Sequence, residues 1–149
     1  MNSPAPFAAD KPIRFHHCDP AGIVFYPQYF VLFNELVEDW FNEGLGIDFA
    51  RFHAVDRLGI PMAHVDCDFL SPSAMGEVLQ FRIAVTKIGK TSLTLAVDAA
   101  TKEEVRVRAT LTVVLVSLDS RRPVPVTSDL RAKLERFVVP LIDPRVRPA

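Results

Sequence analysis

The hydrophobic pattern of this chain changes its period partway along, and that change constrains the fold more than any other feature. Between Pro27 and Gly44, apolar side chains recur at the spacing of an amphipathic helix. From Ile60 onward they alternate with polar ones, which is typical of half-buried strands. Gly89-Lys90 and Lys102-Glu103 fall between the alternating runs, where tight connections are needed. One long apolar helix and several one-sided strands predict an α+β fold in which an antiparallel sheet wraps around that helix.

The segments on either side complete a single predicted domain spanning residues 1–149. Lys11 to His17 reads as a short strand, and Ile47 to Leu58 and Ser128 to Phe137 as shorter helices. The first ten residues hold two prolines and three alanines, and Pro140 to Ala149 holds three prolines and two arginines. We expect both ends to be loose tails around an ordered core of about residues 11–137.

Composition narrows the class of protein. A chain of 149 residues suits one domain, and a net charge of −1 gives no basic excess that would favour nucleic acid as a partner. No apolar run approaches the roughly 20 residues of a membrane span, and the N-terminus has no basic segment followed by an apolar one. Two cysteines, Cys18 and Cys67, suit a reducing compartment. We therefore expect a cytoplasmic protein without nucleic-acid or membrane partners.

A carboxylate stands on a turn just before the predicted long helix. Pro20 and Gly22 punctuate the segment that holds Asp19, and Pro27 suits a first helical position. A helix N-terminus carries unpaired amides and about half a positive charge, which can polarise a carbonyl and stabilise an oxyanion. A nearby carboxylate can attack that carbonyl or take a proton from water. An Asp before a helix is more often a cap or turn residue, so these residues alone leave both interpretations open.

The same stretch resembles the hotdog-fold acyl-CoA thioesterases, of the 4-hydroxybenzoyl-CoA thioesterase type. The matching residues are Cys18-Asp19-Pro20-Ala21-Gly22-Ile23-Val24, Tyr26-Pro27 and Tyr29. Pro61, Phe69 and a strand starting at Glu77 follow in the expected order, so the resemblance covers roughly Ile13 to Val116.

The resemblance implies hydrolysis of an acyl-CoA thioester to the free acid and coenzyme A. It implies Asp19 as nucleophile or general base, and the backbone amide of Tyr26 as the group that polarises the carbonyl. Coenzyme A is then part of the substrate, and no separate cofactor is expected. The residues expected to line the substrate pocket are Pro20, Gly22, Val24 and His64, and those expected to hold the nucleotide end of coenzyme A are Lys87, Lys90 and Thr91.

Two departures from the family pattern refine the expectation. His17 stands where relatives often have an acidic residue. Pro27 stands where one large branch has a histidine, which favours the 4-hydroxybenzoyl-type branch. The preferred acyl group stays open.

Assembly is also predicted. Hotdog thioesterases build their active sites between two subunits, so the resemblance implies a homo-oligomer, a dimer or a dimer of dimers. The run from Glu104 to Val116 would extend about 43 Å as one strand, and its outer face becomes apolar at Val114 and Val116. We expect a second subunit to cover that distal half.

Other interpretations use the same residues. His16, His17, Cys18 and Asp19 could suggest a metal site, but neighbouring strand side chains point to opposite faces, and no metal is expected. Cys18 could be a nucleophile activated by a histidine, although a packed small apolar residue is the commoner role. A hotdog protein that binds acyl-CoA without turnover is the main alternative function, and Asp19 discriminates, because a binding module needs no carboxylate beside the carbonyl.

Overall fold

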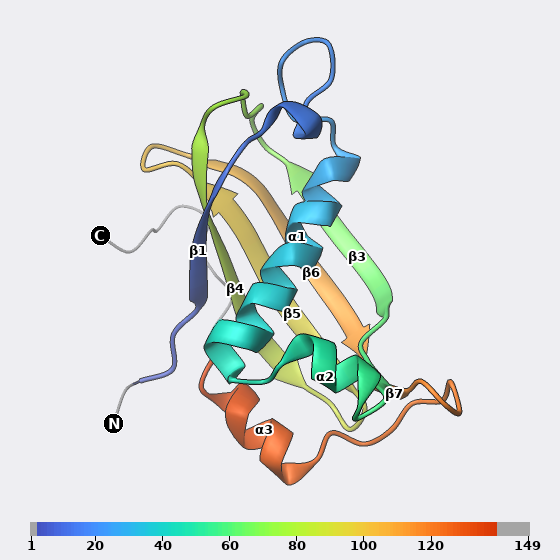
Figure 1. The fold of residues 1–149 in the computed structure, drawn as a ribbon. Helices are drawn as coiled ribbons and strands as arrows, with labels where there is room; N and C mark the ends of the chain where they lie inside the picture. Colours follow the sequence, from blue (N-terminus) through green and yellow to red (C-terminus); the bar gives the residue numbers. More distant parts are fainter. Residues whose placement is uncertain (1–2, 140–149) are drawn as a thin grey trace.

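The computed structural model describes residues 3–139 and has a main antiparallel sheet that curves around a long helix (Figure 1). The five-stranded sheet has the order β1-β4-β5-β6-β3. Its strands are β1 (Phe7–Pro12), β3 (Met62–Phe69), β4 (Val78–Ile88), β5 (Ser92–Ala100) and β6 (Val105–Val114). The α+β hotdog fold expected from the sequence is confirmed.

The long helical segment supplies three of the four largest fully buried side chains, Trp40, Phe33 and Phe41. Helix α1 (Pro27–Asp39) continues without interruption into the π-helical turn η2 (Trp40–Leu45). The helical segment ends at Gly46, whose φ of 70° is left-handed. The sequence predicts that Gly44 and Gly46 end the helix, and Gly44 lies inside the last turn, where a Cβ would come within 2.8 Å of the Trp40 ring. The two shorter helices are also present, as α2 (Phe49–Ala54) and α3 (Ser128–Glu135).

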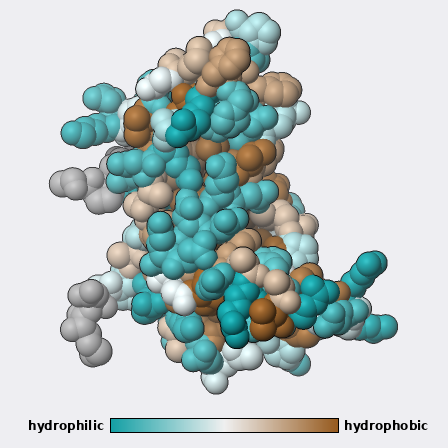
Figure 2. Space-filling model, viewed as in Figure 1, coloured by the Kyte–Doolittle hydropathy of each residue, from teal (hydrophilic) through white to brown (hydrophobic). Residues whose placement is uncertain are grey.

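The period-two alternation places one face of each long strand against α1. Leu79, Phe81, Ile83 and Val85 on β4 are completely buried, as are Leu36 and Trp40 on the helical segment. Hydrophilic residues cover the solvent side of α1 in the space-filling view (Figure 2). The core therefore lies between the helix and the concave face of the sheet.

Two predictions about the N-terminal region are wrong. The expected loose tail already contains β1, which begins at Phe7 and pairs with the edge of β4 from Phe7↔Ile83 to Pro12↔Val78. The expected strand from Lys11 to His17 ends at Pro12 and gives way to the 3-10 turn η1 (Phe15–His17). The His17 ring explains the turn, because its Nδ1 accepts a hydrogen bond of 2.8 Å from the Arg14 amide. The predicted tail from Pro140 to Ala149 lies outside the described residues.

The predicted single strand from Glu104 to Val116 is divided. Strand β6 ends at Val114, and Val116 belongs to β7 (Val116–Ser117), which pairs with β2 (Leu58–Gly59) of the same chain. The Val114 amide donates to the Pro61 carbonyl at 3.1 Å. The distal half of this run therefore obtains backbone partners within its own chain, which removes one reason for expecting a second subunit there.

Candidate active site

Asp19 lies on a small hairpin between η1 and α1. Cys18 pairs with Val24 across the hairpin, and the Asp19 amide donates to the Ile23 carbonyl at 3.0 Å. The Gly22 amide donates back to the Asp19 carbonyl at 2.9 Å, with a φ of 79° that favours glycine. The backbone therefore fixes Asp19 at the base of a tight turn.

The Asp19 carboxylate keeps one oxygen available. Its Oδ1 accepts a hydrogen bond of 2.9 Å from the Ala21 amide, which closes an Asx turn. Within residues 3–139, Oδ2 has no hydrogen-bond donor, and the residue is only half-buried. One oxygen thus orients the group, while the other can attack a carbonyl or accept a proton.

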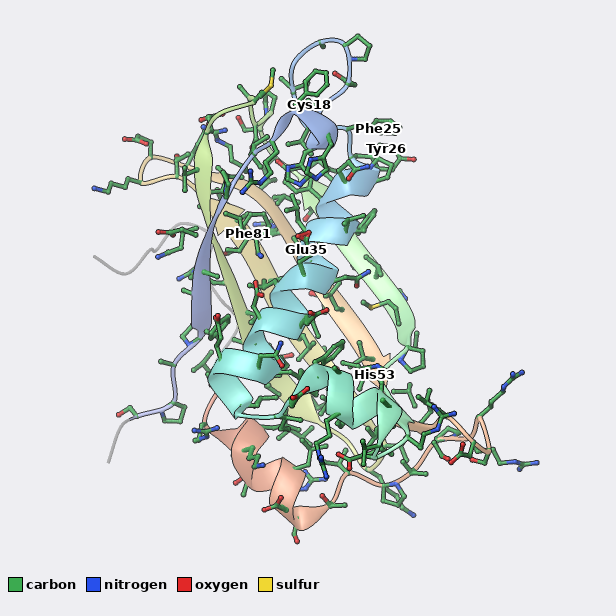
Figure 3. The ribbon with its side chains drawn as sticks, in the orientation of Figure 1. Cys18, Phe25, Tyr26, Glu35, His53 and Phe81 are labelled. Carbon is green, nitrogen blue, oxygen red and sulfur yellow. The ribbon has the colours of Figure 1, made fainter. Side chains whose placement is uncertain are left out.

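The start of α1 leaves one backbone amide unused. Pro27 has no N–H, the Gln28 amide donates to the Phe25 carbonyl at 2.8 Å, and the Tyr29 amide donates to the Tyr26 carbonyl at 3.1 Å. The Tyr26 amide has no acceptor in the part of the chain that the structure describes. Figure 3 shows Tyr26 at the tip of α1, beside Phe25 and close to Cys18 of the hairpin. The amide that the resemblance assigns to carbonyl polarisation is therefore free to donate.

A second loop supports the hairpin. The Val24 amide donates to the Ser73 carbonyl at 2.9 Å, and the Met75 amide donates to the Gly22 carbonyl at 3.1 Å. Behind this loop, the Arg106 guanidinium binds both oxygens of Glu77, at 2.9 and 2.8 Å. Hydrogen bonds from Arg106 and then from the Ala74 amide lower the pKa of Glu77 to about 2. An ion pair that persists across the neutral range thus holds the loop on which the Asp19 hairpin rests.

Sequence reasoning missed this supporting network. Glu77 and Arg106 are 29 positions apart and read as ordinary polar residues at or near strands. Predicting this ion pair would require knowing which strand ends lie side by side. The spacing of apolar residues does not show that.

A cavity of about 280 Å³ opens beside the start of α1. The Phe69 ring lines it and packs against two other lining residues, with ring centroids 5.8 Å from Tyr26 and 6.1 Å from Tyr29. Val24, a predicted pocket residue, also lines it, as does Ser73. The residues around the free amide of Tyr26 therefore form an aromatic-walled hollow of about the size at which small-molecule pockets begin.

Of the other residues predicted for the substrate pocket, two lie in the Asp19 turn and one lies elsewhere. Pro20 is exposed in the Asp19 turn, and Gly22 supports that turn through its backbone. His64 pairs with Thr112 on β6, so its side chain lies on the sheet face away from α1. One protomer therefore does not bring His64 to the Asp19 hairpin.

The predicted residues for coenzyme A lie at the other end of the molecule. Lys87, Lys90 and Thr91 belong to the β4–β5 hairpin, and both lysines are exposed. The 11 residues of β4 separate this hairpin from the Asp19 end, a distance of about 35 Å. Within one chain these residues cannot reach a substrate that is bound at Asp19.

The structure gives little support to a nucleophilic cysteine or to a metal site. Burial and then the neighbouring Asp19 raise the pKa of the Cys18 thiol, and burial raises that of Cys67 to about 11. A protonated thiol is a poor nucleophile. Among residues 3–139, no group of three or more His, Cys, Asp or Glu side chains is arranged to hold a metal ion. No helix in this range is long and apolar enough to span a membrane.

Comparison with known proteins shows which family this chain belongs to. Residues 13–134 match the model of the thioesterase-like superfamily, and the chain belongs to that family. It is a thioester hydrolase with the hotdog fold.

Individual relatives extend the comparison. A 1,4-dihydroxy-2-naphthoyl-CoA hydrolase from Acaryochloris marina is 25% identical over 130 residues, covering 85% of this chain and 94% of the relative. The crystal structure of a 1,4-dihydroxy-2-naphthoyl-CoA thioesterase from Synechocystis is similar with a TM-score of 0.78 and 19% identity, covering 87% of this chain and 96% of that one. A thioesterase-superfamily structure from Jannaschia sp. CCS1 has a TM-score of 0.84 and 22% identity, with coverages of 93% and 98%.

Proposed function

We propose that this enzyme hydrolyses an acyl-CoA thioester whose acyl group is aromatic, and that Asp19 is its catalytic carboxylate. The observation that carries the proposal is that a free Asp19 oxygen and an unused Tyr26 amide occur on the same short segment, a hairpin that leads directly into α1. Hydrolase relatives that act on a naphthoyl-CoA support the aromatic acyl group. The aromatic walls of the neighbouring cavity are consistent with it.

The chemistry requires two functions from these groups. The Tyr26 amide donates to the thioester carbonyl and stabilises the negative charge that develops on its oxygen. The free Asp19 oxygen either attacks the carbonyl carbon or removes a proton from a water that does so. Both routes break the C–S bond and release coenzyme A and the free acid, so the products do not distinguish them.

A second copy of the chain completes the proposed site. Strand β3 lies at the edge of the sheet, and β6 is its partner strand within residues 3–139. Seven of its eight residues are exposed, including Met62, Val65 and Phe69 at 40%, 38% and 48%. An exposed edge of this kind carries unpaired backbone groups and favours pairing with another strand. We infer a dimer in which two β3 strands pair antiparallel across a two-fold axis.

This arrangement explains how the two ends of the molecule could share one site. Antiparallel pairing sets Phe69 of one chain beside the opposite end of β3 in its partner. Near that end lies a groove of about 470 Å³ between α1 and β3, lined by Val31, Glu35, His53 and Met62 among others. Figure 3 shows Glu35 on α1 and His53 on α2, at a distance from Tyr26. The groove of one chain would then close over the Asp19 end of the other.

The same symmetry gives a role to the predicted residues for coenzyme A. In the sheet order, β5 and β4 lie two and three strands from the β3 edge. At about 4.8 Å per strand, a partner's β4–β5 hairpin lies about 10–14 Å from the dimer seam. We propose that Lys87, Lys90 and Thr91 bind the nucleotide end of a coenzyme A whose thioester is held by the other subunit.

A hydrolysis screen tests the proposal. Purified protein is incubated with aromatic and aliphatic acyl-CoAs, and the free thiol of coenzyme A is detected. We expect thiol release from at least one aryl-CoA, at a higher kcat/KM than from aliphatic acyl-CoAs of similar size. Binding of every aryl-CoA without thiol release would favour the non-catalytic alternative. A preference for aliphatic substrates would contradict the proposed acyl group.

A further inference from the structure

Two buried hydroxyl groups lie at the cavity beside Tyr26. Tyr29 on α1 and Ser73 on the supporting loop both line this cavity. Their exposed fractions are 4% and 1%, and the two hydroxyl oxygens are 2.8 Å apart. The pair is therefore nearly closed to bulk water while adjoining a hollow that a ligand could fill.

The Tyr29–Ser73 pair has one more hydroxyl proton than it has acceptors. Arg106 Nη1 donates to Ser73 Oγ at 3.2 Å, so this contact uses an acceptor site and no hydroxyl proton. The two hydroxyls carry two protons and share one hydrogen bond. Whichever hydroxyl donates in that bond, the other proton has no acceptor among residues 3–139. Leaving a buried donor unpaired costs free energy, which a ligand with a suitable acceptor would recover.

The surroundings favour a neutral oxygen as the missing acceptor. Burial raises the pKa of Tyr29, so its phenol stays protonated at neutral pH. Arg106 polarises the pair, but its charge is offset by the two-point contact with Glu77. A hydroxyl or ketone oxygen fits this site better than a carboxylate, which would require a net positive charge.

We propose that the Tyr29–Ser73 pair donates a hydrogen bond to an oxygen substituent on the acyl ring, so that the cavity selects hydroxyaryl acyl groups over unsubstituted ones. The rings of Tyr26, Tyr29 and Phe69 provide the aromatic contact, and the spare proton provides the polar one. This inference rests on the proposed function for its substrate and adds the residues that read the ring oxygen.

Matched substrates test the selection directly. We compare 1,4-dihydroxy-2-naphthoyl-CoA with 2-naphthoyl-CoA, and 4-hydroxybenzoyl-CoA with benzoyl-CoA. The wild type should prefer at least one hydroxylated member by about tenfold or more in kcat/KM, since a site with an unpaired polar group rejects analogues that lack its partner. Equal values in both pairs would overturn the inference without any variant.

Variants then locate the donor. In Tyr29→Phe or Ser73→Ala one hydroxyl remains, so part of the preference should persist. In the double variant both donors are absent, and the two members of each pair should converge in kcat/KM. Ser120→Ala is the matched control, because Ser120 lies outside this cavity, where its Oγ accepts a hydrogen bond from the Arg122 amide at 3.2 Å. A preference that survives in the double variant would show that another group reads the oxygen.

Binding separates this inference from the proposed function. Titration calorimetry on Asp19→Asn measures the affinity of both members of each pair without relying on turnover. Tighter binding of the hydroxylated member, combined with no hydrolysis by the wild type, would contradict the proposed function and retain the inference. Hydrolysis of both members at equal rates and with equal affinity would support the proposed function and contradict the inference.

Discussion

The two ends of the long helical segment are built in different ways. At its C-terminal end Trp40 and Phe41 are 0% and 1% exposed. The Trp40 ring meets Phe137 at 5.7 Å, and the Phe41 ring meets Phe52 at 5.2 Å, both edge-to-face. At its N-terminal end Phe25 and Tyr26 are 48% and 57% exposed. The first end is closed by its own side chains, whereas the second leaves apolar surface that a ligand or a partner can cover.

Polar groups follow the same division. The N-terminal end keeps a free amide at Tyr26 and a free oxygen on Asp19. At the C-terminal end the indole Nε1 of Trp40 is buried without a hydrogen-bond partner in the described chain. This group is enclosed by the edge-to-face rings of Phe41 and Phe137. An unpaired polar group therefore suggests a function where a ligand can reach it.

The largest expected effect is the loss of hydrolysis in Asp19→Asn. The amide preserves the shape of the side chain and removes its charge, so neither attack nor proton removal is possible. We expect kcat to fall by at least about a hundredfold, a loss typical of removing a key transition-state group. The thermal midpoint should stay near that of the wild type.

Asp129→Asn is a suitable control for that change. Asp129 forms a surface pair with Lys133 at 3.9 Å on α3, so its loss should alter neither kcat nor the midpoint appreciably. Wild-type turnover in Asp19→Asn would remove Asp19 from the mechanism.

A substitution at the closed, C-terminal end of the helical segment should lower stability and leave activity unchanged. Trp40→Ala leaves a large cavity among fully buried neighbours, and should lower the free energy of unfolding by about 3–5 kcal/mol. Urea denaturation measures this loss. The folded fraction should keep the wild-type kcat, because Trp40 has no part in the proposed chemistry. A kcat that falls with little loss of stability would mean that the two ends are coupled.

The open end should depend on a second chain. Val65→Lys places a charge on the exposed edge strand β3, which should prevent β3 strands from pairing. Light scattering should then give the 16.6 kDa monomer, with most of the hydrolysis lost. Val55→Lys makes the same change at a residue that is 57% exposed after α2, and should leave the oligomer intact. A fully active monomer would exclude a site shared between subunits.

The sequence predicted the closed end better than the open one. The apolar period from Phe30 to Phe41 depends on burial against the chain's own sheet, so helix, strands and core could be read locally. Asp19 and Tyr26 were assigned because they lie within one short motif that resembles the hotdog thioesterases, and their roles stay predictions. The partnership of Arg106 with Glu77 and Ser73 depends on how distant loops meet, which no local pattern encodes. Strand β1 was missed because its short Pro- and Ala-containing segment gains its stability from the edge of β4.

The hairpin with Lys90 should contribute to binding more than to chemistry. Lys90→Ala removes an exposed charge that we assign to the nucleotide end of coenzyme A, so KM should rise several-fold while kcat changes little. Steady-state kinetics at low salt measure both constants. Lys102→Ala, on the β5–β6 connection, is the matched control. An unchanged KM would indicate that the Lys90 hairpin is simply solvated.

The smallest expected effect is a pH dependence of stability that arises from His17, next to the open end. This side chain is 3% exposed, and burial first, then the charge of His16, lowers its pKa below the ordinary value of 6.5. The unfolded chain therefore binds a proton more readily than the folded one, so stability is full above about pH 6.5 and declines as the pH falls toward the lower folded pKa. Protonation would also cost the hydrogen bond from the Arg14 amide to Nδ1, and with it the turn whose carbonyl at His17 receives the Phe25 amide. Urea midpoints measured between pH 7.5 and 5.5 should fall in the wild type and fall less in His17→Asn, which offers an amide oxygen as a non-titrating acceptor. Identical slopes for the two proteins would place the pH-sensitive group elsewhere.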